Sequence, residues 1–203
     1  MRRLKRPALL LLLVAVVTLP AIADKAKDLY SKGEDAEARQ NFEAAYGFFK
    51  QAYDLKPKDL RYRASFERIR FEAAASIVHQ GQKLRDDGKL DEAVAEFQKA
   101  VQLSGGSPTS IANLARAYVA SGKRSEAEKL LTDLKKRSTT GYSHASEIAV
   151  IYAALGDTDQ AMTWLEKGYE ERFNPGVLLR PGFDPLRSNP RFQDLASRVG
   201  LPR

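Results

Sequence analysis

Few residues of this 203-residue chain have the types and spacing that catalysis or metal binding requires. Its two histidines, His79 and His144, lie in distant segments and outside any HExxH-like pattern. The absence of cysteine excludes disulfides, thiolate zinc sites, iron–sulfur clusters and a cysteine nucleophile. The sequence has no GxSxG elbow, Walker loop or GxGxxG fingerprint, and no carboxylate pair stands out as an acid and its partner. We therefore predict no catalytic residue, no cofactor-binding residue and no metal ligand, which favours a binding protein over an enzyme.

The first 23 residues have the layout of a secretory signal peptide. Four basic residues within positions 1–6 precede an apolar run from Ala8 to Leu19, and Ala21 and Ala23 provide small side chains before Asp24. We predict cleavage between Ala23 and Asp24, and a periplasmic or secreted mature chain. The run of about 12 apolar residues is shorter than the roughly 20 that span a bilayer as a helix. The alternative is an uncleaved N-terminal anchor, which would be the only contact with a membrane.

The net charge of the chain comes mostly from this segment. The whole sequence has 33 Lys and Arg against 26 Asp and Glu, a net charge of +7. Cleavage would remove four bases and no acid, which leaves 29 bases, 26 acids and a net charge of +3. Because nucleic-acid binding depends on a strong basic excess, we expect no nucleic-acid partner.

Two sets of small residues recur along the rest of the chain with the same separations of 48, 34 and 34 positions. The first set is Gly33, Gly81, Ala115 and Ala149, and the second is Ala45, Ala93, Ala127 and Ala161. A large apolar residue follows each member of the second set four positions later, as on one face of a helix. Glycines such as Gly88, Gly122 and Gly156 separate the two helices of a pair and predict helix ends. The pattern predicts helical hairpins whose helices cross at small residues.

A 34-residue helical hairpin with this pattern resembles the tetratricopeptide repeat (TPR). The resemblance implies an all-α fold: a right-handed α-solenoid of about four TPR hairpins with a C-terminal capping helix. Another kind of helical bundle is the alternative. The expected organisation is a signal peptide (1–23), TPR 1 (24–59), a helical extension (60–73), TPR 2 (74–107), TPR 3 (108–141), TPR 4 (142–175) and a C-terminal cap (176–203).

The extension accounts for the one longer separation in the repeat. Residues 60–73 contain no Gly or Pro, so we expect a single helix from about Asp59 to Asp86. Its arginines could form a cationic docking surface, or a solvated face balanced by Glu67 and Glu72, which we favour. These arginines are Arg61, Arg63, Arg68 and Arg70.

The C-terminal block contains two helix-start signals, Asp184-Pro185 and Asn189-Pro190, each with a capping side chain before a proline. Four apolar residues are candidates for covering the open end of the solenoid: Phe183, Leu186, Phe192 and Leu195. A detachable docking motif is the alternative. The block resembles the terminal TPR block of bacterial kinase, adenylate cyclase and winged-helix regulator proteins, which implies a bacterial source. None of those signalling domains is present here.

By resemblance to the family, the first helix of each hairpin lines a concave groove that binds a protein or peptide partner. The candidate groove residues are Tyr30, Glu34, Gln82, Arg85, Asn113, Arg116, Ser146 and Val150. The clamp that holds acidic C-terminal tails in some family members is not matched, and Glu34 would repel a carboxylate. The predicted function is a non-catalytic scaffold or adaptor in the periplasm or cell envelope. The alternative is a membrane-anchored structural or assembly subunit of a secretion or cell-wall complex.

Overall fold

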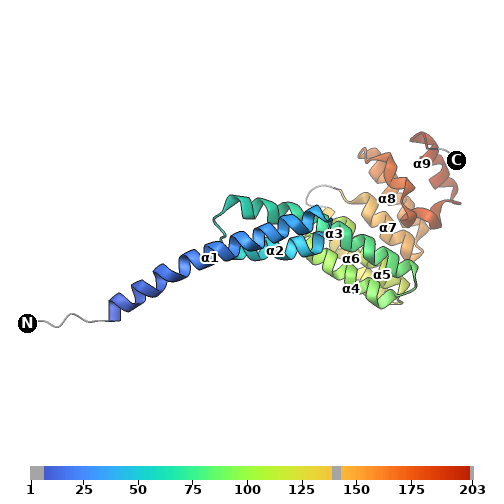
Figure 1. Cartoon of the computed structure of the whole chain (residues 1–203). Coiled ribbons are helices and arrows are strands. Elements are labelled where there is room, and N and C mark those ends of the chain that lie inside the picture. Colours follow the sequence, from blue (N-terminus) through green and yellow to red (C-terminus); the bar gives the residue numbers. More distant parts are fainter. Residues whose placement is uncertain (1–6, 139–142, 202–203) are drawn as a thin grey trace, which may run out of the picture. The chain divides into compact units, whose positions relative to one another are not determined.

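The computed structural model describes residues 7–138 and 143–201, with side chains from residue 23 onward. The regular elements of these residues are all helices (Figure 1). The chain divides into an N-terminal unit, up to Ser76, and a C-terminal unit, from Ile77 on. The start and the side chains of the predicted signal peptide, and the junction at 139–142 between predicted TPR 3 and TPR 4, lie outside the described residues.

Three helices build the N-terminal unit: α1 (Pro7–Ala38), α2 (Phe42–Leu55) and the first part of α3 (Leu60–Asp86). Asn41 caps α2, since its side chain accepts a hydrogen bond from the Ala44 backbone N–H at 3.1 Å. The core combines Ala45 and Phe49 of α2 with Ile69 of α3, all fully buried. The extension 60–73 thus covers the first hairpin and is part of its core.

The arginines of the extension pair mainly with acids of the same unit. Arg61 bonds to Asp59, Arg68 forms a bidentate ion pair with Glu37 of α1, and Arg70 lies 3.4 Å from Glu67. These pairs favour the charge-balanced face over a cationic docking surface. Asp59 and Glu37 add to the balance expected from Glu67 and Glu72, and the charge of Glu72 also acts on Arg68.

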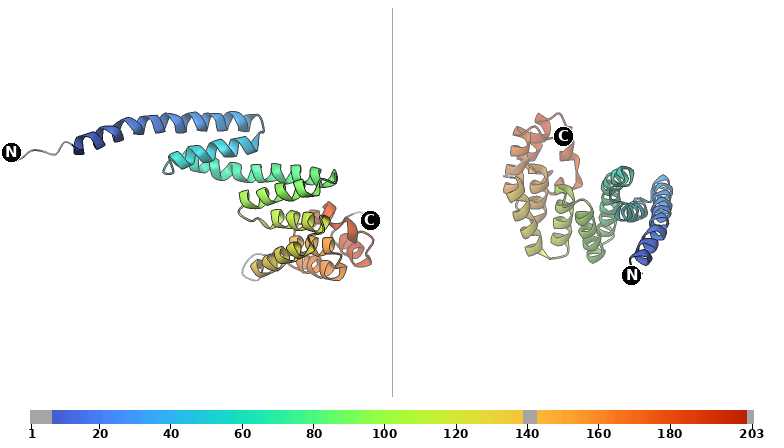
Figure 2. Two further views of the ribbon diagram at one scale, coloured as in Figure 1. Left: turned by 90° about the horizontal axis from the view of Figure 1, so that it is seen from below. Right: turned by 90° about the vertical axis from the view of Figure 1, so that its left-hand side faces the viewer.

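The C-terminal unit continues the hairpins from the end of α3 to the C-terminus. Its further elements are α4 (Leu90–Leu103), α5 (Pro108–Ala120), α6 (Arg124–Ser138), α7 (Ala145–Leu155), α8 (Thr158–Glu170), the 3-10 helices η1 (Pro175–Leu179) and η2 (Pro181–Leu186), and α9 (Pro190–Arg198). Consecutive helices from α4 to α8 pack against one another, and α5 also packs against α7. Figure 2 shows these helices running back and forth within the unit.

The small residues lie where the repeat pattern predicts a close helix crossing. Ala93, Ala127 and Ala161, one in each second helix, are completely buried, as is Ala45. Their partners Ala115 and Ala149 in the first helices are completely buried as well. Gly156 ends α7 with φ 81°, a left-handed conformation that glycine adopts without strain. The predicted register of the helices is confirmed in these repeats.

The C-terminal block packs on the last hairpin as part of the same core. Phe183, Leu186, Phe192 and Leu195 are buried in one cluster with residues of α5 to α8. In both views of Figure 2, this segment (orange to red) lies beside α7 and α8. Such burial supports a permanent cap rather than a detachable motif.

One of the two helix-start predictions in this block is wrong. Asn189 caps α9 by accepting a hydrogen bond from the Arg191 backbone N–H at 2.9 Å, as predicted. Asp184-Pro185 does not start a helix, because both residues lie inside η2, which Pro181 opens. The Asp184 carboxylate instead accepts a hydrogen bond from Arg187 Nε at 2.8 Å.

Candidate protein-binding groove

Two adjoining pockets lie in the C-terminal unit between the first helices of the hairpins and η2. One has a volume of about 260 Å³ and the other of about 520 Å³, and they share Gln82, Arg116 and Pro181. We call the two pockets together the arginine groove. Its principal lining residues are Val78, Gln82, Arg85, Asp86, Asn113, Arg116, Val150, Pro181, Gly182 and Asp184.

The C-terminal block forms one wall of this groove. A Cβ atom on Gly182 would lie 3.0 Å from Val150 Cγ2 and 3.5 Å from Arg116 Cζ. A larger residue at this position would push against Val150, so glycine favours the close approach of the η2 backbone to α7. Arg180, next to η2, donates a hydrogen bond from Nη1 to Glu147 Oε1 of α7 at 3.1 Å. The chain's own cap occupies part of the face that the repeats present.

Five of the predicted groove residues meet around the arginine groove: Gln82, Arg85, Asn113, Arg116 and Val150. Asn113 is buried, and its Nδ2 donates to the Thr109 carbonyl within α5 at 3.0 Å. Val150 is also buried, since η2 covers it. These two positions were expected to face outward and are less accessible than the sequence pattern suggested.

Ser146 lies in a separate pocket of about 510 Å³ near η1, and its hydroxyl donates to Glu147 Oε2 at 2.8 Å. Because Ser146 is buried and its hydroxyl is already bonded, it is less accessible than the sequence pattern suggested.

Tyr30, another candidate groove residue, is also less accessible than the sequence pattern suggested. Its ring packs against Phe49 and Tyr62, with centroids 5.2 and 4.9 Å away, and its hydroxyl bonds to the Ser65 hydroxyl at 3.0 Å. The reason is the extension, because Tyr62 and Ser65 belong to the segment that covers α1. Glu34, the other candidate in the N-terminal unit, is exposed.

The two arginines that give the groove its name are not fully paired. Arg85 Nε and Nη2 donate to Asp86 Oδ1 at 3.1 and 2.8 Å, while its Nη1 is buried and has no hydrogen-bond partner in the described structure. The Arg116 guanidinium makes no hydrogen bond and no ion pair with any described residue. Burial, together with the charge of Arg85, lowers the pKa of Arg116 to about 10, so it stays protonated at neutral pH.

The part of the groove that η2 contributes was not predicted from the sequence. Pro181 and Gly182 fall within the predicted cap (176–203), and Asp184 was predicted only to cap a helix there. Gly182 was the available signal, because a glycine next to a proline in a compact segment often marks close backbone contact. The helices that Gly182 contacts, α5 and α7, are about 30 or more residues away in the sequence. A local sequence pattern therefore could not predict this contact.

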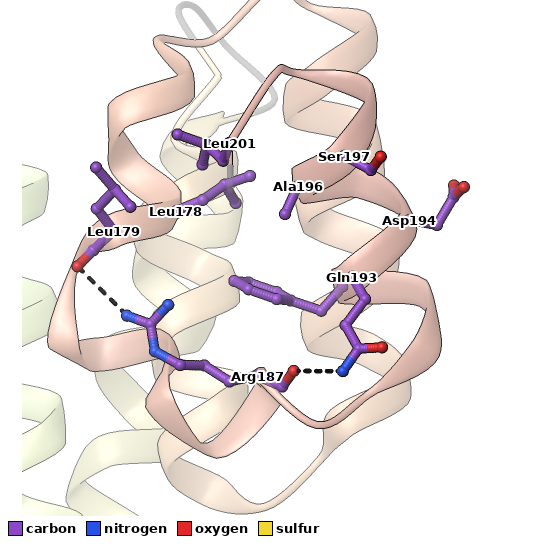
Figure 3. Close-up of a pocket in the computed structure, with 9 residues that line it drawn as sticks. Leu178, Leu179, Arg187, Gln193, Asp194, Ala196, Ser197 and Leu201 are labelled. Carbon is purple, nitrogen blue, oxygen red and sulfur yellow. Dashed lines mark hydrogen bonds between the residues drawn. The ribbon is translucent and has the colours of Figure 1, made fainter. Parts of the chain in front are cut away.

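A further cavity of about 500 Å³ lies within the cap, between η1 and α9 (Figure 3). Leu178, Leu179 and Leu201 provide its apolar wall. Its charged groups already have partners, since Arg187 pairs with Asp184 and Asp194 pairs with Arg198. The cavity therefore presents no charged group that requires a ligand.

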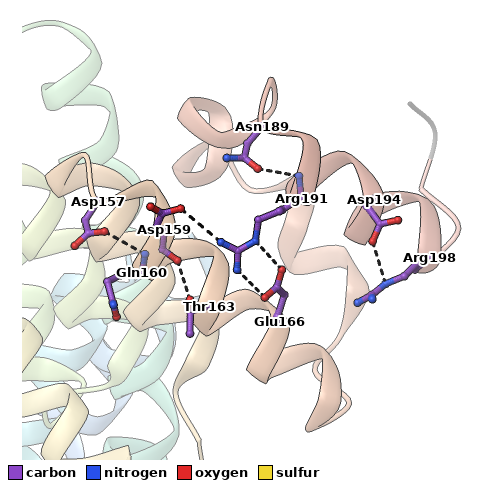
Figure 4. A network of polar contacts seen from close by, with 9 residues as sticks. All are labelled: Asp157, Asp159, Gln160, Thr163, Glu166, Asn189, Arg191, Asp194 and Arg198. Atoms are coloured by element: carbon purple, nitrogen blue, oxygen red, sulfur yellow. Dashed lines mark hydrogen bonds and ion pairs between the residues drawn. The ribbon is translucent and has the colours of Figure 1, made fainter.

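Ion pairs also connect α9 of the cap with α8 of the last hairpin (Figure 4). Arg191 of α9 donates from Nε and Nη2 to the two carboxylate oxygens of Glu166 at 3.0 and 2.8 Å. Its Nη1 also lies 3.6 Å from Asp159 Oδ1. The hydrogen bonds from Arg191 lower the pKa of Glu166 below its ordinary value near 4.5.

The histidines do not form part of a site in the described structure. His79 is exposed on α3, and His144 precedes α7 as its N-cap residue. No group of three or more His, Cys, Asp or Glu side chains in residues 23–138 and 143–201 could hold a metal ion. None of the helices searched in the described part of the chain is long and apolar enough to cross a membrane.

Comparison with known families agrees with this architecture. Two family models described as tetratricopeptide repeat match the chain, one over residues 84–144 and the other over residues 146–175. No curated protein matches the sequence. Repeats of this kind generally mediate contacts between proteins and are typically not catalytic. The hairpins from α4 to α8 therefore lie in the part of the chain that matches the tetratricopeptide repeat.

Proposed function

We propose that this protein is a non-catalytic TPR scaffold of the bacterial periplasm or cell envelope, and that it binds a protein partner through the arginine groove. The observation that carries the proposal is a groove on TPR helices in which two arginines lack a full set of partners. Arginine is enriched among the residues that dominate protein interfaces, because its planar group forms several hydrogen bonds at once.

The export part of the proposal rests on the basic, apolar and small-residue layout of positions 1–23. From residue 23 onward, the buried residues of α1 are Ala26, Leu29, Gly33 and Ala36, and all four would belong to the mature chain. Cleavage between Ala23 and Asp24 would leave these contacts intact and would shorten α1 at its N-terminal end only.

Site-specific photo-cross-linking in the native host tests the binding face. A photoreactive residue replaces Gln82, which lines the arginine groove, or Gln160, which is exposed on α8 outside it. We expect a discrete adduct with a defined protein from position 82 and none from position 160. The same adducts from both positions, or none from position 82, would refute binding through this groove.

Fractionation with N-terminal sequencing tests the location. We expect a soluble periplasmic chain that begins at Asp24. A membrane-bound chain that retains residues 1–23 would instead favour the alternative, an anchored structural or assembly subunit.

A further inference from the structure

The arginine groove contains more positive charge than its own acids neutralise. Four arginines lie in it or beside it: Arg85, Arg116, Arg180 and Arg187. Three acids lie there as well, and each is paired with one of these arginines: Asp86, Glu147 and Asp184. The local balance is one positive charge in excess, and the arginine without an acid is Arg116.

The hydrogen-bonding groups that the two arginines leave unpaired in the groove are all donors. Arg85 Nη1 is buried without a partner, and the Arg116 guanidinium is unbonded in the described structure. Both groups can only donate, since arginine has no acceptor. A buried donor that lacks an acceptor costs free energy, so the groove is suited to a ligand that brings acceptor oxygens.

The two arginines are near neighbours on adjacent first helices, α3 and α5. Both line the larger pocket together with Gln82 and Pro181, and the positive charge of Arg85 acts on Arg116. An anion between them would reduce their mutual repulsion and accept hydrogen bonds from both. Because the excess is a single charge and Asp86 and Asp184 line the same pocket, a singly charged group fits better than a doubly charged one.

We propose that Arg85 and Arg116 bind the carboxylate of an aspartate or glutamate side chain in an extended segment of the partner protein. The inference rests on the proposed function and names the chemistry that the partner must present there. It concerns an internal acidic side chain, held between two repeat helices and the η2 wall of the cap.

Side-chain NMR of the purified full-length protein tests the assignment. The Nε–Hε signals of Arg85 and Arg116 are followed during titration with N-acetyl-glutamate α-amide, with N-acetyl-glutamine α-amide as the neutral isostere. We expect saturable shifts of both signals with the glutamate probe and none with the glutamine probe. Equal shifts with the two probes would overturn the proposal.

Variants separate the site from general electrostatics. We expect Arg85→Gln and Arg116→Gln each to weaken binding of the glutamate probe about tenfold or more. Arg63→Gln is the matched control, because it removes the same charge from an exposed position in the N-terminal unit and should leave binding unchanged. An equal loss in R63Q, or tighter binding of inorganic phosphate than of the glutamate probe, would refute a carboxylate site.

A stability measurement excludes a structural role for Arg116. Because its guanidinium makes no hydrogen bond within the described structure, R116Q should melt at the same temperature as the wild type or higher. A lower melting temperature would show that Arg116 stabilises the fold itself, and the proposal would fail. If the glutamate probe does not bind while position 82 still cross-links to a partner, the carboxylate assignment is wrong and the proposed function stands.

Discussion

Two equivalent glycines, Gly33 and Gly81, give the sharpest test of how the hairpins pack. Each lies inside the first helix of a hairpin, beneath a fully buried phenylalanine of the second helix, Phe49 or Phe97. A Cβ atom on Gly33 would lie 2.6 Å from Phe49 Cδ1 and Cε1. A Cβ atom on Gly81 would lie 2.9 to 3.1 Å from three atoms of the Phe97 ring. Both contacts are shorter than packing tolerates, and the ring has no solvent side toward which it can move.

The expected magnitudes come from two opposing effects. Alanine in place of glycine within a helix stabilises it by about 0.5–1 kcal/mol. Forcing an extra methyl group into a packed core costs about 1–3 kcal/mol. The tighter contact at Gly33 makes overpacking dominate, so we expect Gly33→Ala to lose about 1–2 kcal/mol. Gly81→Ala should lose less, because its contacts are 0.3 to 0.4 Å longer for the two nearest atoms.

Gly47 in the middle of α2 is the matched control, because a Cβ atom there would meet nothing within 4 Å. Gly47→Ala should therefore stabilise the protein by about 0.5–1 kcal/mol. Urea unfolding followed by circular dichroism gives the total stability. Hydrogen exchange of α2 and α4 reports on the two hairpins separately.

A double substitution identifies the cause. Phe97→Leu shortens the side chain above Gly81, so adding G81A in that background should cost less than in the wild type. If Gly33→Ala stabilised the protein as much as Gly47→Ala, the close packing of the hairpins described here would be wrong. Unchanged cost of G81A in the F97L background would also refute it.

Three further predictions address the repeats and the cap. Leucine should cost about 1–3 kcal/mol of stability in thermal unfolding at each of the buried alanines Ala93, Ala127 and Ala161. Leucine at the exposed Gln160 should cost about 0.5 kcal/mol or less. No loss of stability at any of the three alanines would contradict their buried register. Gly182→Ala should speed hydrogen exchange in η2, and Val150→Ala should reverse the effect because it removes the atoms 3.0 and 3.2 Å from the new Cβ. Glu166, whose pKa is lowered by Arg191, should contribute about 0.2–1 kcal/mol of stability above its ordinary pKa near 4.5, and this contribution should disappear as the pH falls through the lowered value. E166Q should remove that part of the pH dependence of unfolding, and an unchanged profile would show that the pair adds nothing.

The sequence by itself determined the repeated hairpin. Small residues at fixed separations predict where two helices approach closely, since only they leave room for the facing side chain, and Ala93, Ala127 and Ala161 are indeed fully buried. Gly156 predicted a helix end because a left-handed residue stops α7 locally. These features depend on neighbours within a few residues or one repeat, so the periodicity of the sequence records them.

Only the tertiary structure decided what the repeats expose. Tyr30 points into the core because the extension, which interrupts the repeat, packs over α1 through Tyr62 and Ser65. Val150 is covered because Gly182 lets η2 lie on α7. Arg116 lacks an acidic partner because the acids near it pair with other arginines of α3 and the cap. These contacts join segments outside the repeat period, so the periodic pattern contains no information about them.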